Sequence, residues 1–220
     1  MINITTTLGD GLHGTPKYSE KGEYYFINGN NLSDGKILIK PDTKRVDKEE
    51  FEKYKKNLNQ STVLVSINGT IGNTAFYKDE PVILGKSACY FNVAEGISKE
   101  YIRYNLKTPA FINYAIKNAT GSTIKNVGLK TMRDYLVPVP VNKNEQNQIV
   151  REIESRLSIC DKVEQSISEA LEKAEALRQS ILKKAFEGKL LTKAEIAKCK
   201  QEADYEPASE LLKKIKAEKK

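Results

Sequence analysis

Three short polar loops hold the side chains best suited to recognise another molecule. They cover residues 11–18 (GLHGTPKY), 28–31 (NGNN) and 120–126 (TGSTIKN). Asparagine amides match the edge of adenine, whereas lysine and arginine match guanine edges and phosphates. Glycine-rich and asparagine-rich loops are more often ordinary turns, so each loop alone is weak evidence. The chemistry they indicate together is hydrogen bonding to bases and phosphates.

The candidate binding residues are polar or basic side chains, most of them in these loops. We expect nucleic-acid contacts from Lys17, Tyr18, Asn30, Asn68, Lys86, Thr123, Lys125 and Asn126. Phosphate contacts are expected from three further basic residues, namely Lys107, Lys117 and Arg133.

The motifs of the common catalytic classes are missing. His13 is the only histidine, which removes H-E-x-x-H metal sites and multi-histidine clusters. The sequence has no G-x-x-x-x-G-K-[ST] phosphate loop, no G-x-S-x-G elbow and no N/D-P-P-Y/F methyltransferase motif, and none of the predicted strands leads into G-x-G-x-x-G. We therefore expect a non-catalytic protein that binds no cofactor and no metal.

The loop Gly69-Thr70-Ile71-Gly72, between two predicted strands, has two interpretations. Its glycines can serve a turn that requires positive φ, which is the more frequent role. They can also let the backbone approach a phosphate.

Charge is concentrated in one segment. The chain carries a net charge of +7, and residues 99–143 contribute +6 of it, from eight basic and two acidic residues. Residues 1–98 are neutral overall. A basic segment inside a folded domain is typical of a surface that binds a polyanion, although a solvated lysine-rich face is the alternative.

Short strands and two capped helices must position these loops. Runs rich in β-branched and aromatic residues, separated by Asn-Gly and Asp-Gly turns, predict strands; they cover Tyr24–Ile27, Lys36–Ile39, Thr62–Ile67, Thr74–Tyr77, Ala88–Val93 and Tyr135–Val139. Asp47 and Glu50 form a capping-box pattern that predicts a helix to about Lys56, and Thr108-Pro109 predicts another to about Asn118.

Beyond Pro138-Val139-Pro140 the composition predicts one long helix. No glycine or proline occurs from Asn144, the expected N-cap, to Gly188, the expected stop. Apolar residues recur from Ile149 to Ala185 with a mean spacing of 3.6 residues, which suits a nearly straight helix packed along a partner. The expected helix-helix contacts come from Ile153, Leu157, Val163, Ile167, Leu171, Leu177 and Ile181. Two short helices are expected at 190–200 and 207–219.

Composition also indicates the cellular compartment in which the protein acts. There is no apolar run of 18 residues and no signal-peptide pattern, so we expect a soluble cytoplasmic protein without a membrane partner. Cys89, Cys160 and Cys199 lack C-x-x-C spacing, and we interpret them as reduced thiols.

Ordered motifs along nearly the whole chain resemble the specificity (S) subunits of Type I restriction-modification systems. The most specific is the helix end LRQSILKKAFEGKL at 177–190. The others are GTPKY at 14–18 with Gly22 and the Tyr24–Ile27 strand, Ser66-x-x-Gly69-x-x-Gly72, Pro138-Val139-Pro140 with Glu145-Gln146-x-x-Ile149-Val150, and EPASELL at 206–212.

The resemblance implies an α+β fold in two parts. A mixed α/β target-recognition domain with a short-stranded sheet is expected at 1–142. A helical arm is expected at 143–220, with a long helix at about 145–187 that forms an antiparallel coiled-coil-like pair. In this family each recognition domain reads one half of a bipartite double-stranded DNA site. The resemblance therefore implies that this chain reads one half-site and docks methyltransferase (M) and restriction (R) subunits, which use S-adenosylmethionine and ATP.

The sequence departs from the family in three ways. It holds one recognition domain and one long helix instead of two of each, its beginning is shorter than the usual lead-in strand, and residues 141–143 (VNK) replace a more common proline. The first departure implies a half-size subunit that works as a homodimer, or a fragment of a longer chain. Two other functions stay open: a helical scaffold that does not read DNA, and the recognition segment of a fused restriction-modification enzyme.

Overall fold

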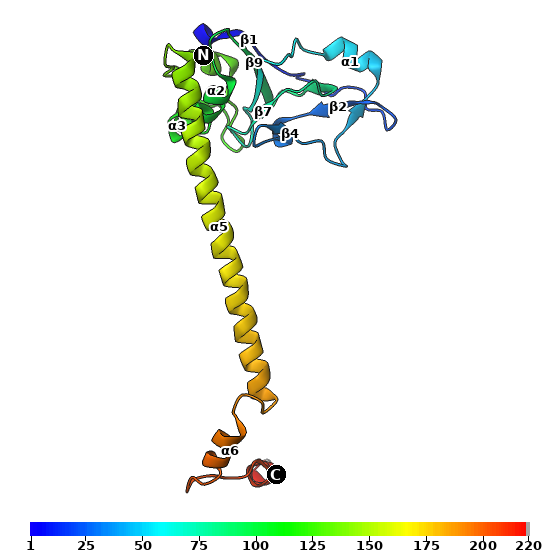
Figure 1. Cartoon of the computed structure of the whole chain (residues 1–220). Coiled ribbons are helices and arrows are strands. Elements are labelled where there is room, and N and C mark those ends of the chain that lie inside the picture. Colours follow the sequence, from blue (N-terminus) through cyan, green and yellow to red (C-terminus); the bar gives the residue numbers. More distant parts are fainter. Residues whose placement is uncertain (219–220) are drawn as a thin grey trace. The chain divides into compact units, whose positions relative to one another are not determined.

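The computed structural model describes residues 1–218. It falls into two compact units, of which the first covers Met1–Ser155 and the second begins at Arg156. The expected domain boundary at residue 142 stays a prediction. The fold class is the mixed α+β architecture with a long helix that the sequence indicates (Figure 1).

The first unit contains the strands and the shorter helices of the recognition part. In chain order its elements are η1 (Ile2–Ile4), β1 (Thr5–Asp10), β2 (Tyr24–Ile27), η2 (Gly29–Asn31), β3 (Leu32–Ser33), β4 (Lys36–Ile37), β5 (Arg45–Val46), α1 (Lys48–Tyr54), β6 (Thr62–Ser66), β7 (Thr74–Phe76), β8 (Val82–Leu84), β9 (Ala88–Val93), α2 (Lys99–Leu106), α3 (Pro109–Lys117), α4 (Leu129–Asp134) and the start of α5 (Lys143–Phe186).

A four-stranded antiparallel sheet, in the order β1-β9-β6-β7, lies at the centre of this unit. A smaller sheet, β5-β2-β8, pairs β2 with β8 in parallel, and β3 and β4 form a hairpin. Asp34 and Gly35 both have positive φ (44° and 79°). A two-residue turn with positive φ at both positions fits the hairpin twist and explains the Asp-Gly pair.

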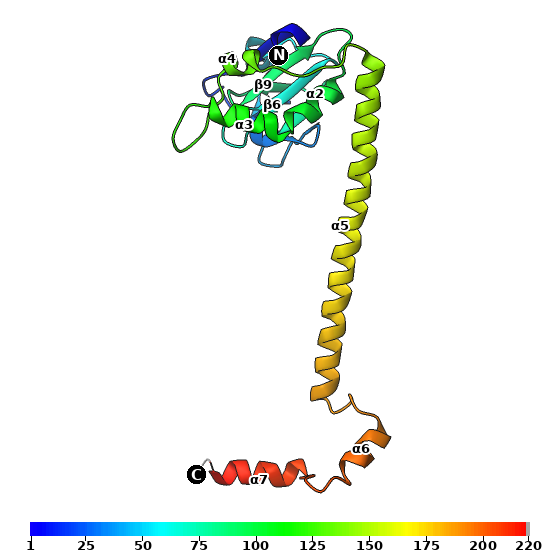
Figure 2. The same ribbon diagram turned by 90° about the vertical axis from the view of Figure 1, so that its left-hand side faces the viewer.

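Both faces of the central sheet are covered. Val63, Val65 and Phe91 face the core formed with helices α2, α3 and α4, whereas Leu64 and Tyr90 face the smaller sheet. Figure 2 shows α2 and α3 crossing one face of β6 and β9. Because both faces are buried, the central residues of β6, Val63-Leu64-Val65, are all apolar instead of alternating with polar ones.

Several predicted elements are confirmed, among them β2 and β9 with the expected bounds and the helix capped by Thr108. The Thr108 side chain accepts a hydrogen bond from the Phe111 backbone amide at 3.3 Å. The helix expected after Asp47 forms as α1, but the capping box is wrong because Asp47 makes no side-chain cap. Glu50 is buried and accepts from the Lys17 backbone amide at 3.0 Å instead.

The strand expected at Tyr135–Val139 is also wrong, since this segment has no regular secondary structure and lies outside all three sheets. Its carbonyls accept hydrogen bonds from groups other than a neighbouring strand: the Met1 amine donates to Tyr135, and the Tyr101 hydroxyl donates to Pro138 at 2.6 Å. Pro138 and Pro140 have no amide hydrogen to add to a ladder.

The long helix α5 spans 44 residues, about 65 Å at ~1.5 Å per residue. It begins earlier than expected. Asn144, the expected N-cap, lies inside the helix, and the Asn142 side chain accepts from the Asn144 amide at 2.9 Å. Gly188 has the positive φ (67°) of a helix stop, as predicted.

In the second unit α5 is followed by two short helices, α6 (Lys193–Cys199) and α7 (Ala208–Glu218). They correspond to the two short helices expected from the sequence, although Lys219, the expected end of the last one, lies outside the described residues. Among residues 1–218, no helix combines the length and apolarity that crossing a bilayer requires.

Candidate nucleic-acid interface

Ser87 joins three loops at one end of β6 and β9: residues 28–31, residues 67–72 and its own loop, residues 85–87. Its hydroxyl accepts from the Gly29 amide at 2.9 Å and donates to Asn28 Oδ1 at 3.0 Å, while its carbonyl accepts from the Ile67 amide at 3.0 Å. A Cβ at Gly29 would lie 2.8 Å from the Ser66 Cβ, so only glycine fits there. The loops that carry Asn30, Lys86 and Asn68 therefore converge.

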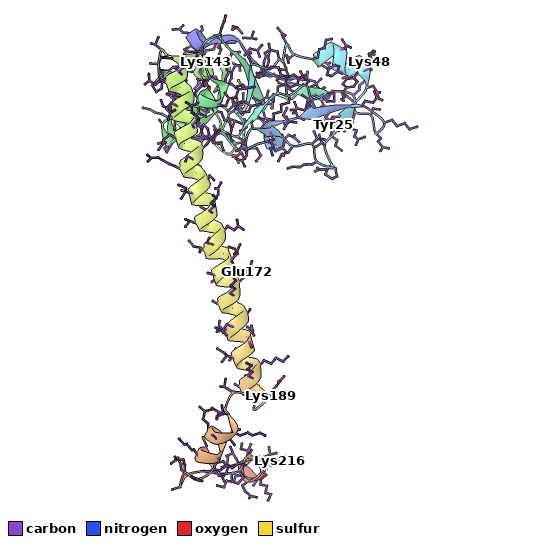
Figure 3. The ribbon with its side chains drawn as sticks, in the orientation of Figure 1. Tyr25, Lys48, Lys143, Glu172, Lys189 and Lys216 are labelled. Atoms are coloured by element: carbon purple, nitrogen blue, oxygen red, sulfur yellow. The ribbon has the colours of Figure 1, made fainter. Side chains whose placement is uncertain are left out.

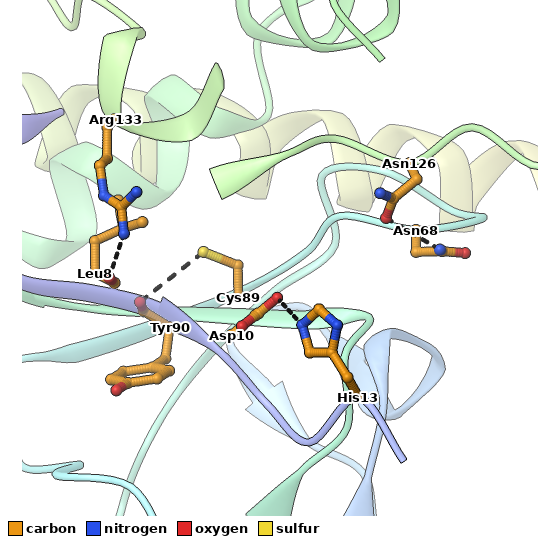
Figure 4. A network of polar contacts seen from close by, with 8 residues as sticks. All are labelled: Leu8, Asp10, His13, Asn68, Cys89, Tyr90, Asn126 and Arg133. Carbon is orange, nitrogen blue, oxygen red and sulfur yellow. Dashed lines mark hydrogen bonds and ion pairs between the residues drawn. The ribbon is translucent and has the colours of Figure 1, made fainter. Parts of the chain in front are cut away.

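The loop 120–126 lies against the loop that carries Asn68. The Gly69 amide donates to the Lys125 carbonyl at 3.1 Å, and the amide of buried Val127 donates to the Ile67 carbonyl at 2.8 Å. The side chains of Asn68 and Asn126 also meet, with Asn68 Nδ2 donating to Asn126 Oδ1 at 3.1 Å (Figure 4).

Backbone hydrogen bonds close the loop 120–126 on itself. Thr120 and Asn126 exchange two of them, at 2.9 and 2.8 Å, and Gly121 has a positive φ of 88°. Within the loop Thr123 and Lys125 are exposed, as is the apolar Ile124. Thus the predicted residues Asn68, Thr123, Lys125 and Asn126 lie on two adjoining loops, 67–72 and 120–126, which we call the rim loops.

The glycines of the Gly69–Gly72 loop have the positive φ that the turn interpretation requires, 73° and 92°. Gly72 is also crowded, because a Cβ there would lie 2.4 Å from Ile112 Cδ1. A Cβ at Gly69 would meet open space. The structure thus accounts for both glycines by conformation and packing, and an approach to phosphate stays a hypothesis.

The loop 11–18 runs beside Leu84 and Gly85. The Leu12 amide donates to the Leu84 carbonyl at 2.7 Å, and His13 Nε2 contacts Asp10 Oδ2 at 2.7 Å (Figure 4). Because the Lys17 backbone is held by Glu50, its exposed side chain is carried on a fixed loop.

Residues Gly9 to Gly14 (GDGLHG) spell G-x-G-x-x-G, and β1 ends within the pattern at Asp10, so the expectation that no strand precedes such a pattern is wrong. A dinucleotide site also needs a helix directly after the glycines. In this part of the chain residues 15–23 form a loop that leads into β2. The glycine pattern is therefore not part of a dinucleotide-binding site.

A basic and aromatic cluster beside Tyr18 was not predicted. The Tyr18 ring lies 6.1 Å from Phe26, with Lys44 Nζ 5.9 Å from the Tyr18 centroid, and Arg45 lies 5.3 Å from the Tyr25 ring. A shallow hollow of about 160 Å³ links this cluster to Asn30. Averaging charge over residues 1–98 hides the cluster, because acidic residues such as Asp42 cancel it. The dipeptide Lys44-Arg45 was the available signal.

The three phosphate candidates lie on other segments. Lys107 Nζ contacts Asp34 Oδ1 at 2.8 Å. The hydrogen bond from Lys107, and then its charge, lower the pKa of Asp34. Arg133 Nη2 donates to the Leu8 carbonyl at 3.5 Å (Figure 4), and Lys117 is exposed at the end of α3. None of the hydrogen bonds described above for the rim loops involves these side chains.

Gln146 fixes the start of α5 to the first unit. It is fully buried; its Oε1 accepts from the Ser98 amide at 2.8 Å, and its Nε2 donates to the carbonyls of Pro140 (2.8 Å) and Gly96 (3.3 Å). This polar anchor was not predicted, although Gln146 stands in one of the motifs quoted above. Its acceptor and donors are all used, as a buried amide requires.

The apolar stripe of α5 is uncovered over most of its length. Ile153 is half-buried, whereas the exposed fractions of the other predicted contacts range from 45% at Ile181 to 70% at Leu171. The remaining four are Leu157, Val163, Ile167 and Leu177. Figure 3 shows the side chains around Glu172 standing out from the helix.

The three cysteines differ in burial. Cys89 is buried, and burial raises the pKa of its thiol, whereas Cys160 and Cys199 are exposed. Within residues 1–218 no cluster of three or more His, Cys, Asp or Glu side chains could hold a metal ion.

Comparison with known proteins relates the chain to one family. The model of the Type I restriction modification DNA specificity domain matches residues 13–173. The EcoBI specificity subunit of Escherichia coli is 26% identical over 200 residues, which cover 86% of this chain and 40% of that protein. The EcoKI specificity subunit, also from Escherichia coli, is 34% identical over 122 residues, which cover 54% and 26%. The chain thus spans less than half the length of these relatives.

Solved structures share the fold. The HsdS subunit from Thermoanaerobacter tengcongensis superposes with a TM-score of 0.54 at 17% identity, over 86% of this chain and 44% of that one. A chain from a study of the assembly and conformational transition of the type I R-M system gives a TM-score of 0.61 at 17% identity, over 83% and 44%.

Proposed function

The chain belongs to the Type I restriction modification DNA specificity family, and from this premise we propose that it reads one half of a bipartite DNA site. One observation carries the proposal: four polar loops converge. Ser87 joins the loops bearing Asn30, Lys86 and Asn68, and Val127 ties the loop 120–126 to them. Polar side chains on short, tied loops can be held at fixed positions against base edges.

We assign two roles within this surface. The amides of Asn30, Asn68 and Asn126 are suited to bases, because they offer both a donor and an acceptor. Lys17, Lys86 and Lys125 are suited to phosphates, with Tyr18 and Thr123 supporting them. Lys117 and Arg133 extend the positive surface, whereas Lys107 is already paired with Asp34 and adds less.

We propose that the arm, residues 143–220, docks the other subunits. The exposed stripe on α5 needs an apolar partner, because a row of large side chains in water costs free energy that burial would recover. A second copy of α5 lying antiparallel supplies the matching stripe and makes a homodimer. The pair would space two recognition domains by about 65 Å, close to two turns of B-DNA at ~34–36 Å each.

We assign catalysis to the partner subunits. The sequence has no motif for nucleotide or methyl transfer, so methylation with S-adenosylmethionine and ATP-driven cleavage are assigned to the methyltransferase and restriction subunits. The chain would act on DNA in the cytoplasm as a non-catalytic specificity subunit.

Competition binding at two salt concentrations tests the proposal. The full chain, with its methyltransferase subunit, is challenged with randomised 30-base-pair duplexes over bulk DNA. A specificity subunit enriches one sequence at low and at moderate salt, because base contacts persist when phosphate contacts are screened. A scaffold that does not read DNA would lose affinity for all duplexes to the same extent as salt rises, and that result would reject the proposed function.

A further inference from the structure

The side-chain pair of Asn68 and Asn126 lies where two separate loops meet. Each loop is already tied by backbone: Gly69 to Lys125, and Val127 to Ile67, at 3.1 and 2.8 Å. These bonds hold the loops without help from the amides. The contact between the two side chains, at 3.1 Å, is therefore not needed to keep the loops together.

The pair keeps unused hydrogen-bonding groups. Within residues 1–218, Asn68 Oδ1 and Asn126 Nδ2 make no hydrogen bond, and neither residue is fully buried. An amide nitrogen carries two hydrogens and an amide oxygen two lone pairs, so each side chain retains a donor and an acceptor. Exchanging N and O in both amides leaves the same free donors and acceptors, so either orientation of the pair offers both.

The contact also fixes the direction of both amides. A free asparagine on a loop loses side-chain entropy when it binds, whereas an amide already bonded to its neighbour has lost much of it beforehand. Figure 4 shows the two side chains side by side, with the Asn68 oxygen and the Asn126 nitrogen away from the shared hydrogen bond.

We propose that the Asn68–Asn126 pair is a specificity determinant that reads an adenine in the major groove. This inference rests on the function proposed above. Adenine presents an acceptor, N7, beside a donor, the N6 amino group, and a side-chain amide matches both. Guanine presents two acceptors there, and cytosine only a donor, so neither matches a donor and acceptor together. Exposed Lys125, next to Asn126, is placed to meet the adjoining phosphate.

The test compares the sequences selected by the full chain and by its variants from randomised duplexes. Wild type is expected to enrich a sequence with adenine at a fixed position. Asn68→Ala and Asn126→Ala should each relax that position alone, lowering the preference for adenine by about 10-fold. Asn113→Ala, an exposed amide on α3, is the matched control and should keep the wild-type sequence.

A base analogue isolates the contact. Replacing that adenine with 7-deazaadenine removes N7 and keeps the base pair, so wild type should bind about 10-fold more weakly. Asn126→Ala should lose nothing more on the analogue, because the two changes remove the same bond. Asn126→Asp keeps the shape but replaces a donor by an acceptor, and it should move the preference from adenine towards cytosine.

The possible failures are distinguishable. Suppose that wild type selects a sequence. If the alanine variants keep that sequence unchanged, or bind all duplexes equally weakly while circular dichroism shows them folded, the adenine contact is wrong and the proposed function stands. If wild type selects no sequence, both the proposed function and this contact are wrong.

Discussion

The recognition unit and the arm of this protein differ in how far their apolar side chains are covered. In the first unit Phe91 has no exposed surface, and the central sheet is covered on both faces. In the described residues from 156 to 218 no side chain is buried, and Phe186 is 91% exposed. The first unit therefore contains its own core, whereas residues 156–218 leave their large apolar side chains exposed.

The largest expected effect breaks the core of the first unit. Phe91→Ala should destabilise it by about 3–5 kcal/mol, because the change removes buried surface and leaves a cavity. Phe186→Ala, the same substitution on the arm, should change the free energy of unfolding of the monomer by less than about 0.5 kcal/mol. Urea unfolding of both variants, followed by circular dichroism, measures the difference. Equal losses would contradict the contrast between the two regions.

A charge in the arm's stripe should act on association instead. Leu171→Asp places a carboxylate in the proposed helix-helix contact and should weaken self-association, or methyltransferase binding, by about 10- to 100-fold. The recognition unit should stay folded. Analytical ultracentrifugation gives the dimer dissociation constant.

Ala176→Asp is the control for that variant, since at 3.6 residues per turn it lies roughly 140° around the helix from Leu171. It should leave association unchanged. If Leu171→Asp also leaves both dimer mass and methyltransferase binding unchanged, the assignment of the helix face is wrong.

Much of this contrast can be predicted from the sequence. The apolar run of β9 and the spacing along α5 each follow one repeating rule, and Thr108 with Pro109 marks a helix start by local chemistry alone. The segment 135–139 misleads because its β-branched and aromatic residues suit a strand, yet its prolines and its hydrogen bonds to distant groups prevent one. β1 (TTTLGD) was missed because its residues do not alternate between polar and apolar.

The candidate site is less accessible to sequence reasoning. Asparagine-rich turns point to polar loops, but only the fold places Asn68 against Asn126, 58 positions apart in the chain. The helix α2 could have been found, since Ser98 caps it and Ile102 and Leu106 lie on one face. The burial of Gln146 depends on partners at residues 96, 98 and 140, and no local pattern indicates it.

A moderate effect is expected at that anchor. Gln146→Ala leaves the Ser98 amide and the Pro140 carbonyl without their partner in a buried place, which should cost about 1–3 kcal/mol. Gln148→Ala, on the exposed side of the same turn of α5, should cost little. Thermal unfolding of the two variants compares them, and a Gln146→Ala protein as stable as wild type would show that the anchor is not needed.

The smallest expected effect concerns the exposed ion pair of Asp34 with Lys107. Lys107 lowers the pKa of Asp34 below its ordinary value of 3.8. The stabilisation is therefore present above that pH and is lost as pH falls through the lowered pKa. Because Asp34 is largely exposed, Asp34→Asn should cost no more than about 0.5 kcal/mol at neutral pH and nothing in strong acid.

Asp42→Asn is the control for this pair, since Asp42 is an exposed carboxylate in the same unit. Unfolding midpoints at pH 7 and pH 2.5 compare the variants. A larger loss for Asp34→Asn in acid than at neutral pH would contradict the assigned direction.

The form of the selected DNA tests the central claim most directly, because it reports on the reader and the arm together. Sequencing duplexes enriched by the full chain with its methyltransferase subunit should give two inverted copies of one short half-site, separated by a fixed stretch of unread base pairs. Enriched duplexes with a single uninterrupted site, or with two copies at variable spacing, would contradict a reader held at a set distance by a pair of α5 helices.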